Sequence, residues 1–396
     1  MRKAKLVVTF ESAPSYEVRI AGGALDKLGE DVRCALECAD DDLTGAGDDL
    51  TGAGAKAAGA AADAAAGAAA DAAAGAGEAP DDSRIILLAD ASAPKSAVQS
   101  AKVALAQAGY RTVCISASAT DALATAGELW QAFTRIHASS KEVVVALGDT
   151  PFLQLAGFVA TAFSGGLACV YAPTTLAGAL TMSVSDCAPL NVSGTNAQVK
   201  AELHPAFSCV DLNVLAQATP EQWQSSFALL VQAALLSSDE FFFWLCDNAS
   251  ALRNHSTEVL CEALVRALSF RSALSTRAEK GNASAFDCLR YGQEFAYATG
   301  ASLAQGMRFS ALLAQFKGLI SPDIVEAQDS LLSSLGFIQP DTFDTKQALE
   351  GLLSFESLAK SKQGEGAYLI LPLDIGQVER VFVPVEELQS CLEVFL

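Results

Sequence analysis

Apolar and polar positions alternate in two different ways along this chain, and the change between them marks its organisation. In the first half, short apolar runs typical of buried strands are separated by longer segments whose apolar residues recur at helical spacing. We expect strands at 5–10, 16–20, 84–89, 111–116, 142–147 and 167–172, and helices at 25–36, 95–108, 121–136 and 152–163. Strands that alternate with helices predict a doubly wound, Rossmann-like parallel sheet covered on both faces.

After about residue 190 the alternation gives way to long stretches of helical periodicity. These stretches cover 220–246, 256–280, 287–317, 322–335 and 345–362, and two strands at 367–372 and 378–383 follow them. The sequence therefore predicts an N-terminal α/β domain over 1–185 and a mainly α-helical C-terminal domain over 186–396. A small-molecule site is expected in the cleft between two such domains.

Residues 38–83 fit neither pattern. Asp-Asp-Leu-Thr-Gly-Ala-Gly occurs at 41–47 and again at 48–54, and an alanine-rich octapeptide follows twice at 60–67 and 68–75. The segment has almost no bulky apolar side chain to bury, so packing could not offset the entropy lost on ordering it. We expect a flexible, disordered surface insertion rich in Ala, Gly and Asp.

The charge of the chain argues against some classes of binding partner. The net charge is -20, and no run of Lys and Arg is dense enough to follow a phosphate backbone, which argues against nucleic acid and an anionic membrane surface. The longest apolar stretch, 227–236, is too short to span a bilayer. The apolar run at 6–10 behind the basic N-terminus is too short for a signal peptide, so we expect a cytoplasmic protein.

The potential metal ligands are few or scattered. The ten cysteines lie mostly inside apolar runs, as buried reduced thiols do, and only Cys34 and Cys38 are close in sequence. Without a second Cys/His pair nearby, those two are expected on one face of a helix. The three histidines are His137, His204 and His255, and for each a surface or helix-capping position is expected.

One strand-to-turn-to-helix junction has the position of a nucleotide-phosphate site. The strand at 142–147 runs into Gly148-Asp149-Thr150-Pro151, and a helix follows. In a doubly wound sheet, dinucleotide phosphates bind at such a helix N-terminus. Pro151 suits the first helical turn, but Asp149 would repel a pyrophosphate.

Several segments together resemble the 3-dehydroquinate synthase family. They are Leu-Ala-Gly-Phe at 155–158, Ala-Pro-Thr-Thr-Leu-Ala at 172–177, Ser-Val at 183–184, His-Pro at 204–205, Val-Asp at 210–211 and Asp-Glu-Phe-Phe-Phe-Trp-Leu at 239–245. The resemblance implies an NAD-dependent carbon–oxygen lyase of the shikimate pathway of aromatic amino-acid biosynthesis, with zinc or cobalt as its metal. It also implies a seven-carbon sugar-acid phosphate as the substrate.

At most positions where the resemblance implies a functional group, this sequence holds another residue. For NAD, phosphate and carboxylate these positions are 148–150, Leu153, Gln154, Gly165, Thr181, Ser185, Asp186, Cys187, Asn196 and Gln232. For the metal they are Leu229, Gln293 and the segment 299–301. We therefore assign no catalytic residue and no metal ligand, and expect the zinc or cobalt of the family to be absent.

What remains of the implied site is small. Gly148, Thr174 and Thr175 are the candidates for contacting NAD, while Asn191 and Lys360 are the candidates for contacting substrate. These residues favour a catalytically degenerate family member with a structural or regulatory role. The alternatives are an active 3-dehydroquinate synthase with a rearranged site, and new chemistry in the old cleft. For protein partners, a homodimer and pairing with an intact paralogue both stay open.

Overall fold

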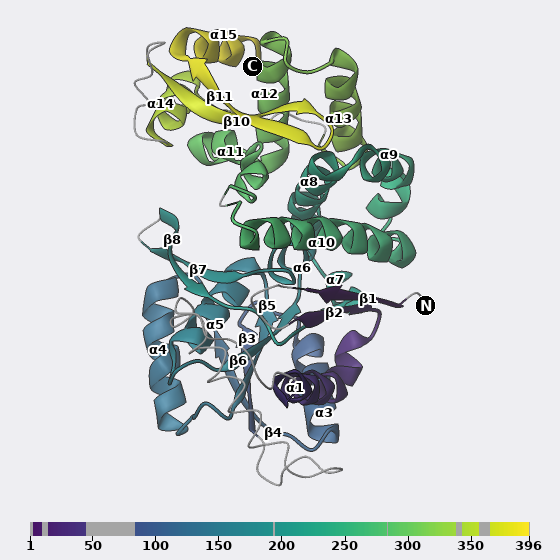
Figure 1. Cartoon of the computed structure of the whole chain (residues 1–396), viewed down its shortest axis with the longest axis vertical. Coiled ribbons are helices and arrows are strands. Elements are labelled where there is room, and N and C mark those ends of the chain that lie inside the picture. Colours follow the sequence, from purple (N-terminus) through teal and green to yellow (C-terminus); the bar gives the residue numbers. More distant parts are fainter. Residues whose placement is uncertain are drawn as a thin grey trace. The chain divides into compact units, whose positions relative to one another are not determined.

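The computed structural model describes residues 3–9, 15–44, 84–192, 195–282, 284–337, 343–355 and 365–395. The chain divides into two compact units, Met1–Ala218 and Thr219–Leu396. Each unit has its own sheet or sheets (Figure 1). Each also has its own apolar core. None of the helices in the described ranges is long and apolar enough to cross a membrane.

The first unit is built on a seven-stranded sheet in the order β1-β2-β9-β6-β5-β3-β4. The strands are β1 (Lys3–Val8), β2 (Tyr16–Ala21), β3 (Arg84–Asp90), β4 (Arg111–Ala117), β5 (Val143–Gly148), β6 (Ala168–Pro173) and β9 (Phe207–Asp211). β1 and β2 pair antiparallel, and all other neighbours in this sheet pair parallel. The Rossmann-like α/β class predicted from the hydrophobic pattern is thus confirmed.

Helices cover both faces of this sheet (Figure 1). They are η1 (Ala24–Lys27), α1 (Leu28–Thr44), α3 (Lys95–Gln107), α4 (Ala122–Arg135), α5 (Thr150–Ala162), α6 (Leu176–Met182) and α7 (Leu212–Leu215). Strand β5 shows why its sequence is apolar throughout. Val145 and Leu147 lie in the core with α1 and α3, whereas Val144 and Ala146 lie in the opposite core with α4 and α5.

A buried ion pair joins the amino ends of two central strands. The Arg84 guanidinium pairs with Glu142, Nε lying 3.1 Å from Oε1, and it also donates to the carbonyls of Ile136 and His137. The other oxygen of Glu142 accepts from Ser139 N at 2.5 Å. Burial pushes the pKa of Glu142 upward, but the hydrogen bonds from Ser139 and Arg84 outweigh it and leave this pKa below its usual value of 4.5.

The first unit extends past the boundary expected at residue 185. Strand β9 lies between β2 and β6 in the main sheet, so the chain returns to this unit after residue 185. Before β9, strands β7 (Cys187–Val192) and β8 (Thr195–Glu202) form a separate two-stranded antiparallel sheet. Neither β9 nor the β7–β8 pair was expected from the sequence.

The insertion expected at 38–83 begins inside a helix. Helix α1 continues to Thr44, so its last turns include the first residues of that segment, Cys38 among them. The rest of the insertion, 45–83, lies outside the described residues. Residues 38–44, which were expected within the insertion, are therefore helical.

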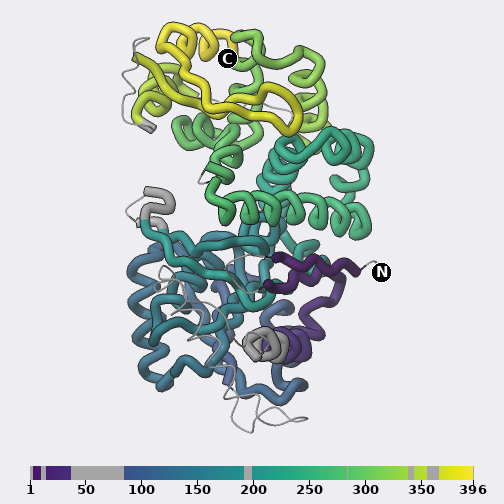
Figure 2. The backbone as a smooth tube through the Cα atoms, viewed as in Figure 1, coloured from purple at the N-terminus to yellow at the C-terminus, as the bar shows by residue number. Residues whose placement is uncertain are grey.

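The second unit is mainly helical, as expected. Its elements are α8 (Pro220–Ser237), α9 (Asp239–Arg253), α10 (Thr257–Glu279), η2 (Asp287–Arg290), α11 (Gln293–Thr299), α12 (Leu303–Phe316), α13 (Pro322–Ser334), α14 (Thr345–Phe355), β10 (Gly366–Asp374), β11 (Gln377–Pro384) and α15 (Val385–Phe395). Figure 2 shows the last part of the chain, in yellow, passing from the β10–β11 hairpin into α15. The rings of Phe295 and Phe309 stack with their centroids 4.3 Å apart in the core that these elements enclose.

Two of the long helices expected in this unit are interrupted. Ser238 ends α8 and caps α9 through its side chain, which splits the segment 220–246. The segment 287–317 divides into η2, α11 and α12, with Gly292 in the left-handed region at φ 78°. A side chain at Gly306 in α12 would overlap the carbonyl oxygen of Gly292, so these two backbones approach as closely as glycine permits.

Candidate functional site

The β5–α5 turn in the first unit is the candidate nucleotide-phosphate position. Gly148 is the last residue of β5, and a Cβ there would lie 2.6 Å from Cδ1 of Phe152 and 2.9 Å from Cβ of Asp90, so only glycine fits. Asp149 follows as the N-cap of α5, and its Oδ1 accepts from Thr150 N at 2.6 Å. The turn is therefore capped by a carboxylate of the chain itself.

The neighbouring β6–α6 turn is tied to the first. Thr174 N donates to the carbonyl of Gly148 at 2.9 Å. The hydroxyl of Thr175 donates to Asp149 and accepts from Gly178 N at 3.1 Å, capping α6. Thr174 and Thr175 are only 6% and 3% exposed. The structure thus brings the three candidate cofactor residues together, but it uses the Thr175 hydroxyl inside the protein.

A second side-chain contact, between the hydroxyls of Thr150 and Thr181, joins α5 to α6. Thr181, where the resemblance implies an aspartate, lies with its Oγ1 3.1 Å from that of Thr150 and donates to the carbonyl of Ala177 at 2.8 Å. The two helices therefore meet through neutral groups at this point.

Several other positions from the family pattern lie away from these turns. Leu153 is fully buried in the core beneath α5. Gly165 lies in the turn before β6, at the amino edge of the sheet, whereas Gly148 and Thr174 lie at the carboxyl edge. Asn191 belongs to β7, but its side chain is not among those described, and Lys360 lies outside the described residues. Their assignment to substrate stays a prediction.

In the second unit, Gln232 stands where the resemblance implies a lysine. It lies in α8 and is 3% exposed. Its side-chain nitrogen donates to the carbonyl of Leu289 at 3.0 Å and to that of Tyr291 at 2.6 Å. Gln232 therefore holds the η2–α11 connection in place, and its amide nitrogen is engaged in that contact.

Tyr291 continues this buried polar contact. It is fully buried, and its hydroxyl lies 2.6 Å from Oε1 of Gln328 and 3.2 Å from the carbonyl of Met307. Burial raises the pKa of the Tyr291 phenol well above its usual value. Sequence reasoning missed this role. An aromatic polar residue directly before Gly292 was the available signal, because a buried tyrosine hydroxyl requires a partner.

An ion pair occupies the helix where the resemblance implies a metal-binding histidine. Glu294 is 2% exposed, with Oε1 3.2 Å from Nη2 of Arg290 and Oε2 accepting from Ile370 N at 3.1 Å. Its carboxylate therefore neutralises Arg290 and holds strand β10. Gln293, at the aligned metal position, is half-buried at the start of α11. Thr299 donates to the carbonyl of Phe295 at 2.7 Å.

This set of residues does not fit a zinc or cobalt ion. Zinc is bound by thiolate, imidazole or carboxylate, whereas the aligned positions hold the side chains of Leu229, Gln293 and Thr299. Within the described ranges, no group of three or more His, Cys, Asp or Glu residues is arranged to hold a metal ion.

The histidines lie in other environments. His137 and His255 follow the C-termini of α4 and α9 with left-handed backbones. The His255 ring stacks on Trp223 at 4.2 Å, and Nε2 of His204 lies 3.9 Å from Glu202. The exposed positions of His137 and His255 at helix ends match those expected, whereas the side chain of His204 is only 19% exposed, which differs from the surface or capping position expected for it.

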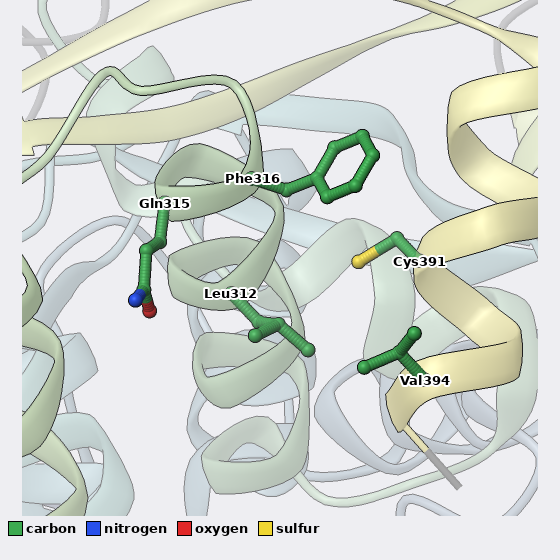
Figure 3. A pocket seen from close by; sticks show the side chains of 5 residues that line it. All are labelled: Leu312, Gln315, Phe316, Cys391 and Val394. Atoms are coloured by element: carbon green, nitrogen blue, oxygen red, sulfur yellow. The ribbon is translucent and has the colours of Figure 1, made fainter.

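One hollow lies between α12 and α15 in the second unit. It has a volume of about 240 Å³ and is lined by Leu312, Gln315, Phe316, Cys391 and Val394 (Figure 3). Phe316 and Val394 are 60% and 74% exposed, and the buried thiol of Cys391 has its pKa raised to about 12. The lining is mostly apolar, with Gln315 as its amide and no charged group, so it lacks the chemistry that a phosphorylated substrate requires.

Comparison with known proteins identifies the relatives of this chain. The family model described as 3-dehydroquinate synthase N-terminal matches residues 112–225. The 3-dehydroquinate synthase of Rhodopirellula baltica is 26% identical over 268 residues, which are 64% of this chain and 72% of that protein. That of Mycolicibacterium gilvum is 26% identical over 259 residues, or 63% of this chain and 71% of that protein.

Solved structures agree on the fold. A 2-deoxy-scyllo-inosose synthase complexed with carbaglucose-6-phosphate, NAD+ and Co2+ has a TM-score of 0.75 at 17% identity, covering 98% of this chain and 99% of the other. The 2-epi-5-epi-valiolone synthase of Streptomyces hygroscopicus subsp. jinggangensis, with NAD+ and Zn2+ bound, has a TM-score of 0.66 at 15% identity, covering 79% and 91%. The chain is thus similar in sequence to 3-dehydroquinate synthases, whose N-terminal family model matches it over residues 112–225, and it has the fold of these solved synthases.

Proposed function

We propose that this chain is a catalytically degenerate 3-dehydroquinate synthase-like protein that has kept the fold for a structural or regulatory role. The observation that carries this proposal is the engagement of Gln232. At the position of an implied substrate-binding lysine, the chain has a neutral amide whose nitrogen donates to two backbone carbonyls inside the second unit. A group used in this way is a structural contact and has no charge to offer an anion.

The charges at the other aligned positions support the same proposal. The implied substrate carries a phosphate and a carboxylate, which need cationic or metal partners once they leave water. Gly165, Cys187 and Asn196 supply no cation. Arg290 is positive, but its guanidinium pairs with the buried carboxylate of Glu294. Each such partner is worth about 2–5 kcal/mol, so several losses together remove many orders of magnitude in rate.

The metal-binding positions add an independent argument. A bound metal in such a site polarises an oxygen of the substrate. Leu229, Gln293 and Thr299 do not fit zinc or cobalt, so we propose no catalytic step through a metal. The 2-deoxy-scyllo-inosose synthase and 2-epi-5-epi-valiolone synthase structures hold Co2+ and Zn2+ respectively, so this donor set separates the present chain from them.

The proposed role places the chain in the cytoplasm beside an intact 3-dehydroquinate synthase of the shikimate pathway, as a homodimer or as the partner of that paralogue. Mixing the two purified proteins and measuring mass by light scattering tests the pairing. A mixed species, or a change in the turnover of the intact enzyme, supports the regulatory role. If the two proteins have the same masses when mixed as when separate, and the turnover of the intact enzyme is unchanged, the result argues against that role.

The enzymatic part of the proposal is tested by phosphate release. The protein is supplied with the seven-carbon substrate, NAD and zinc or cobalt, and the synthase of Rhodopirellula baltica is assayed in parallel. We expect no release above the rate without protein. A rate within about tenfold of the parallel enzyme would instead establish the alternative, an active synthase with a rearranged site.

A further inference from the structure

The N-terminus of α5 in the first unit already holds an anion. Helix α5 runs from Thr150 to Ala162, and its first backbone N–H groups lack partners within the helix. Together with the helix dipole, such groups form the site at which a dinucleotide phosphate binds in doubly wound folds. Here Oδ1 of Asp149 accepts from Thr150 N at 2.6 Å, so a carboxylate lies where that phosphate would approach.

A second contact fixes this carboxylate. The hydroxyl of Thr175, 3% exposed, donates its proton to Asp149 and accepts from Gly178 N. One bond network therefore caps α5 and α6 at once, and Thr174 N closes it by donating to the carbonyl of Gly148. A phosphate could reach these donors only after the Asp149 side chain had left both of its partners.

The surroundings of the turn disfavour a phosphate as well. Asp90, at the end of β3, places its Cβ 2.9 Å from where a Cβ on Gly148 would lie. The Asp90 carboxylate accepts from Ser92 N at 2.9 Å, so a second acidic residue stands at the neighbouring strand end, while the Gly148 position is too crowded for any side chain. A dianionic pyrophosphate brought here would meet like charges in a partly buried place, where charge repulsion is poorly screened.

We propose that Asp149, held by Thr175, is a built-in anion that closes the dinucleotide-phosphate site of the first unit. The residues of this turn fit an internal carboxylate and do not fit the pyrophosphate of NAD. The claim concerns binding to the first unit. It is separate from the proposed loss of turnover, which rests on the metal-binding positions and on the positions for substrate cations.

The test is to open the site by substitution in the full-length protein. Asp149→Asn removes the charge and keeps an N-cap residue, because asparagine caps helices as well as aspartate does. Asp149→Gly removes the side chain altogether. Asp121→Asn is the matched control: Asp121 is the N-cap of α4 in the same unit, its Oδ1 accepts from Ala124 N at 3.1 Å, and its loss changes the net charge equally.

Binding of NADH is followed by its fluorescence, binding of inorganic pyrophosphate by the shift in unfolding temperature, and folding by circular dichroism. We expect no saturation of the wild-type protein or of Asp121→Asn up to about 1 mM of either probe, and binding at least about tenfold tighter for Asp149→Asn. Should Asp149→Gly fail to fold, Asp149→Asn still decides the question.

Two results would overturn the proposal. One is wild-type protein that binds NADH with a Kd below about 0.1 mM, because the site would then be open. The other is folded Asp149→Asn that binds neither probe better than Asp121→Asn, because the carboxylate would then not be the barrier. Neither result bears on phosphate release, so a failure of this proposal is distinguishable from a failure of the proposed function.

Discussion

Replacing Gln232 with leucine tests the contact that carries the proposed loss of catalytic function, the hydrogen bonds from the Gln232 amide to the carbonyls of Leu289 and Tyr291. The two side chains are similar in volume, so Gln232→Leu removes the amide without leaving a large cavity. The carbonyls of Leu289 and Tyr291, now bonded at 3.0 and 2.6 Å, lose a buried donor. A buried polar group left without its partner costs about 1–3 kcal/mol, so we expect a loss of about 2–4 kcal/mol in the free energy of unfolding.

Gln224→Leu is the matched control. Gln224 lies in the same helix, and its amide also donates to a backbone carbonyl, that of Gly336 at 3.2 Å, but it is exposed. Water can replace that bond, so the expected change is below about 0.5 kcal/mol. The pair of variants therefore separates the effect of burial from the effect of losing an amide in α8.

Urea unfolding followed by circular dichroism gives the free-energy difference from the shift in midpoint. Because the chain has two compact units, hydrogen exchange with mass spectrometry should accompany it. For Gln232→Leu, peptides covering 284–300 should lose protection, while peptides covering 143–173 should keep theirs. A Gln232→Leu protein within about 0.5 kcal/mol of wild type would refute the reasoning, because the amide would then be dispensable.

Three further predictions test the packing and the titrating groups. Gly127→Ala in α4 should stabilise the protein by about 0.5–1 kcal/mol, because a methyl group there meets nothing within 4 Å, whereas Gly306→Ala should destabilise it by at least about 2 kcal/mol, because its methyl group would overlap the carbonyl oxygen of Gly292. Equal shifts of the two variants in thermal unfolding temperature would contradict this. Iodoacetamide at about pH 8 should modify the exposed Cys34 and spare Cys391, whose pKa burial raises to about 12; peptide masses showing equal modification would be inconsistent with that burial. The pKa of Glu142 is lowered on folding, so its contribution to stability is present above about pH 4.5 and is lost as the pH falls through the pKa of the folded state. The urea midpoint of Glu142→Gln should therefore depend less on acid pH than that of the wild type, and midpoints that fall in parallel with pH would count against the ion pair.

Much of the first unit could be predicted from sequence because its strands are buried on both faces. Strand β5 reads as an unbroken apolar run, and such runs between amphipathic helices have few alternatives to a covered parallel sheet. Strand β9 was missed because its run is short and comes after the apparent end of the alternation. Its position between β2 and β6 depends on tertiary pairing that no local pattern encodes.

Helix ends in the second unit were partly readable. Ser238 followed by Asp239 and Glu240 is an N-cap with acids in the first turn, and this signal could have placed the break between α8 and α9. The left-handed Gly292 similarly marks the start of α11, and it was overlooked because the apolar periodicity continues across it. Periodicity finds helical segments, whereas their boundaries depend on capping residues.

The candidate site shows a different limit. The sequence indicated that Asp149 would repel a pyrophosphate, but its bond with Thr175 could not be predicted, because the two residues meet only through the pairing of β5 with β6. Likewise, Gln232 could be seen as a lost lysine, whereas its contact with the η2–α11 connection depends on the packing of helices far apart in sequence. Replacement is visible in a sequence, but the new structural use of a residue is visible only in the fold.

A single-turnover measurement tests the central claim, the loss of the synthase reaction, most directly. Protein in excess over the seven-carbon substrate, with NAD and zinc or cobalt present, is followed by phosphorus-31 NMR for hours, so that even one slow turnover per molecule is seen. The account predicts that the substrate phosphate signal stays unchanged, because Leu229, Gln293 and Thr299 are not zinc or cobalt ligands and Gln232 has no charge to offer an anion. Appearance of inorganic phosphate in stoichiometric amount, faster than in a sample without protein, would contradict it.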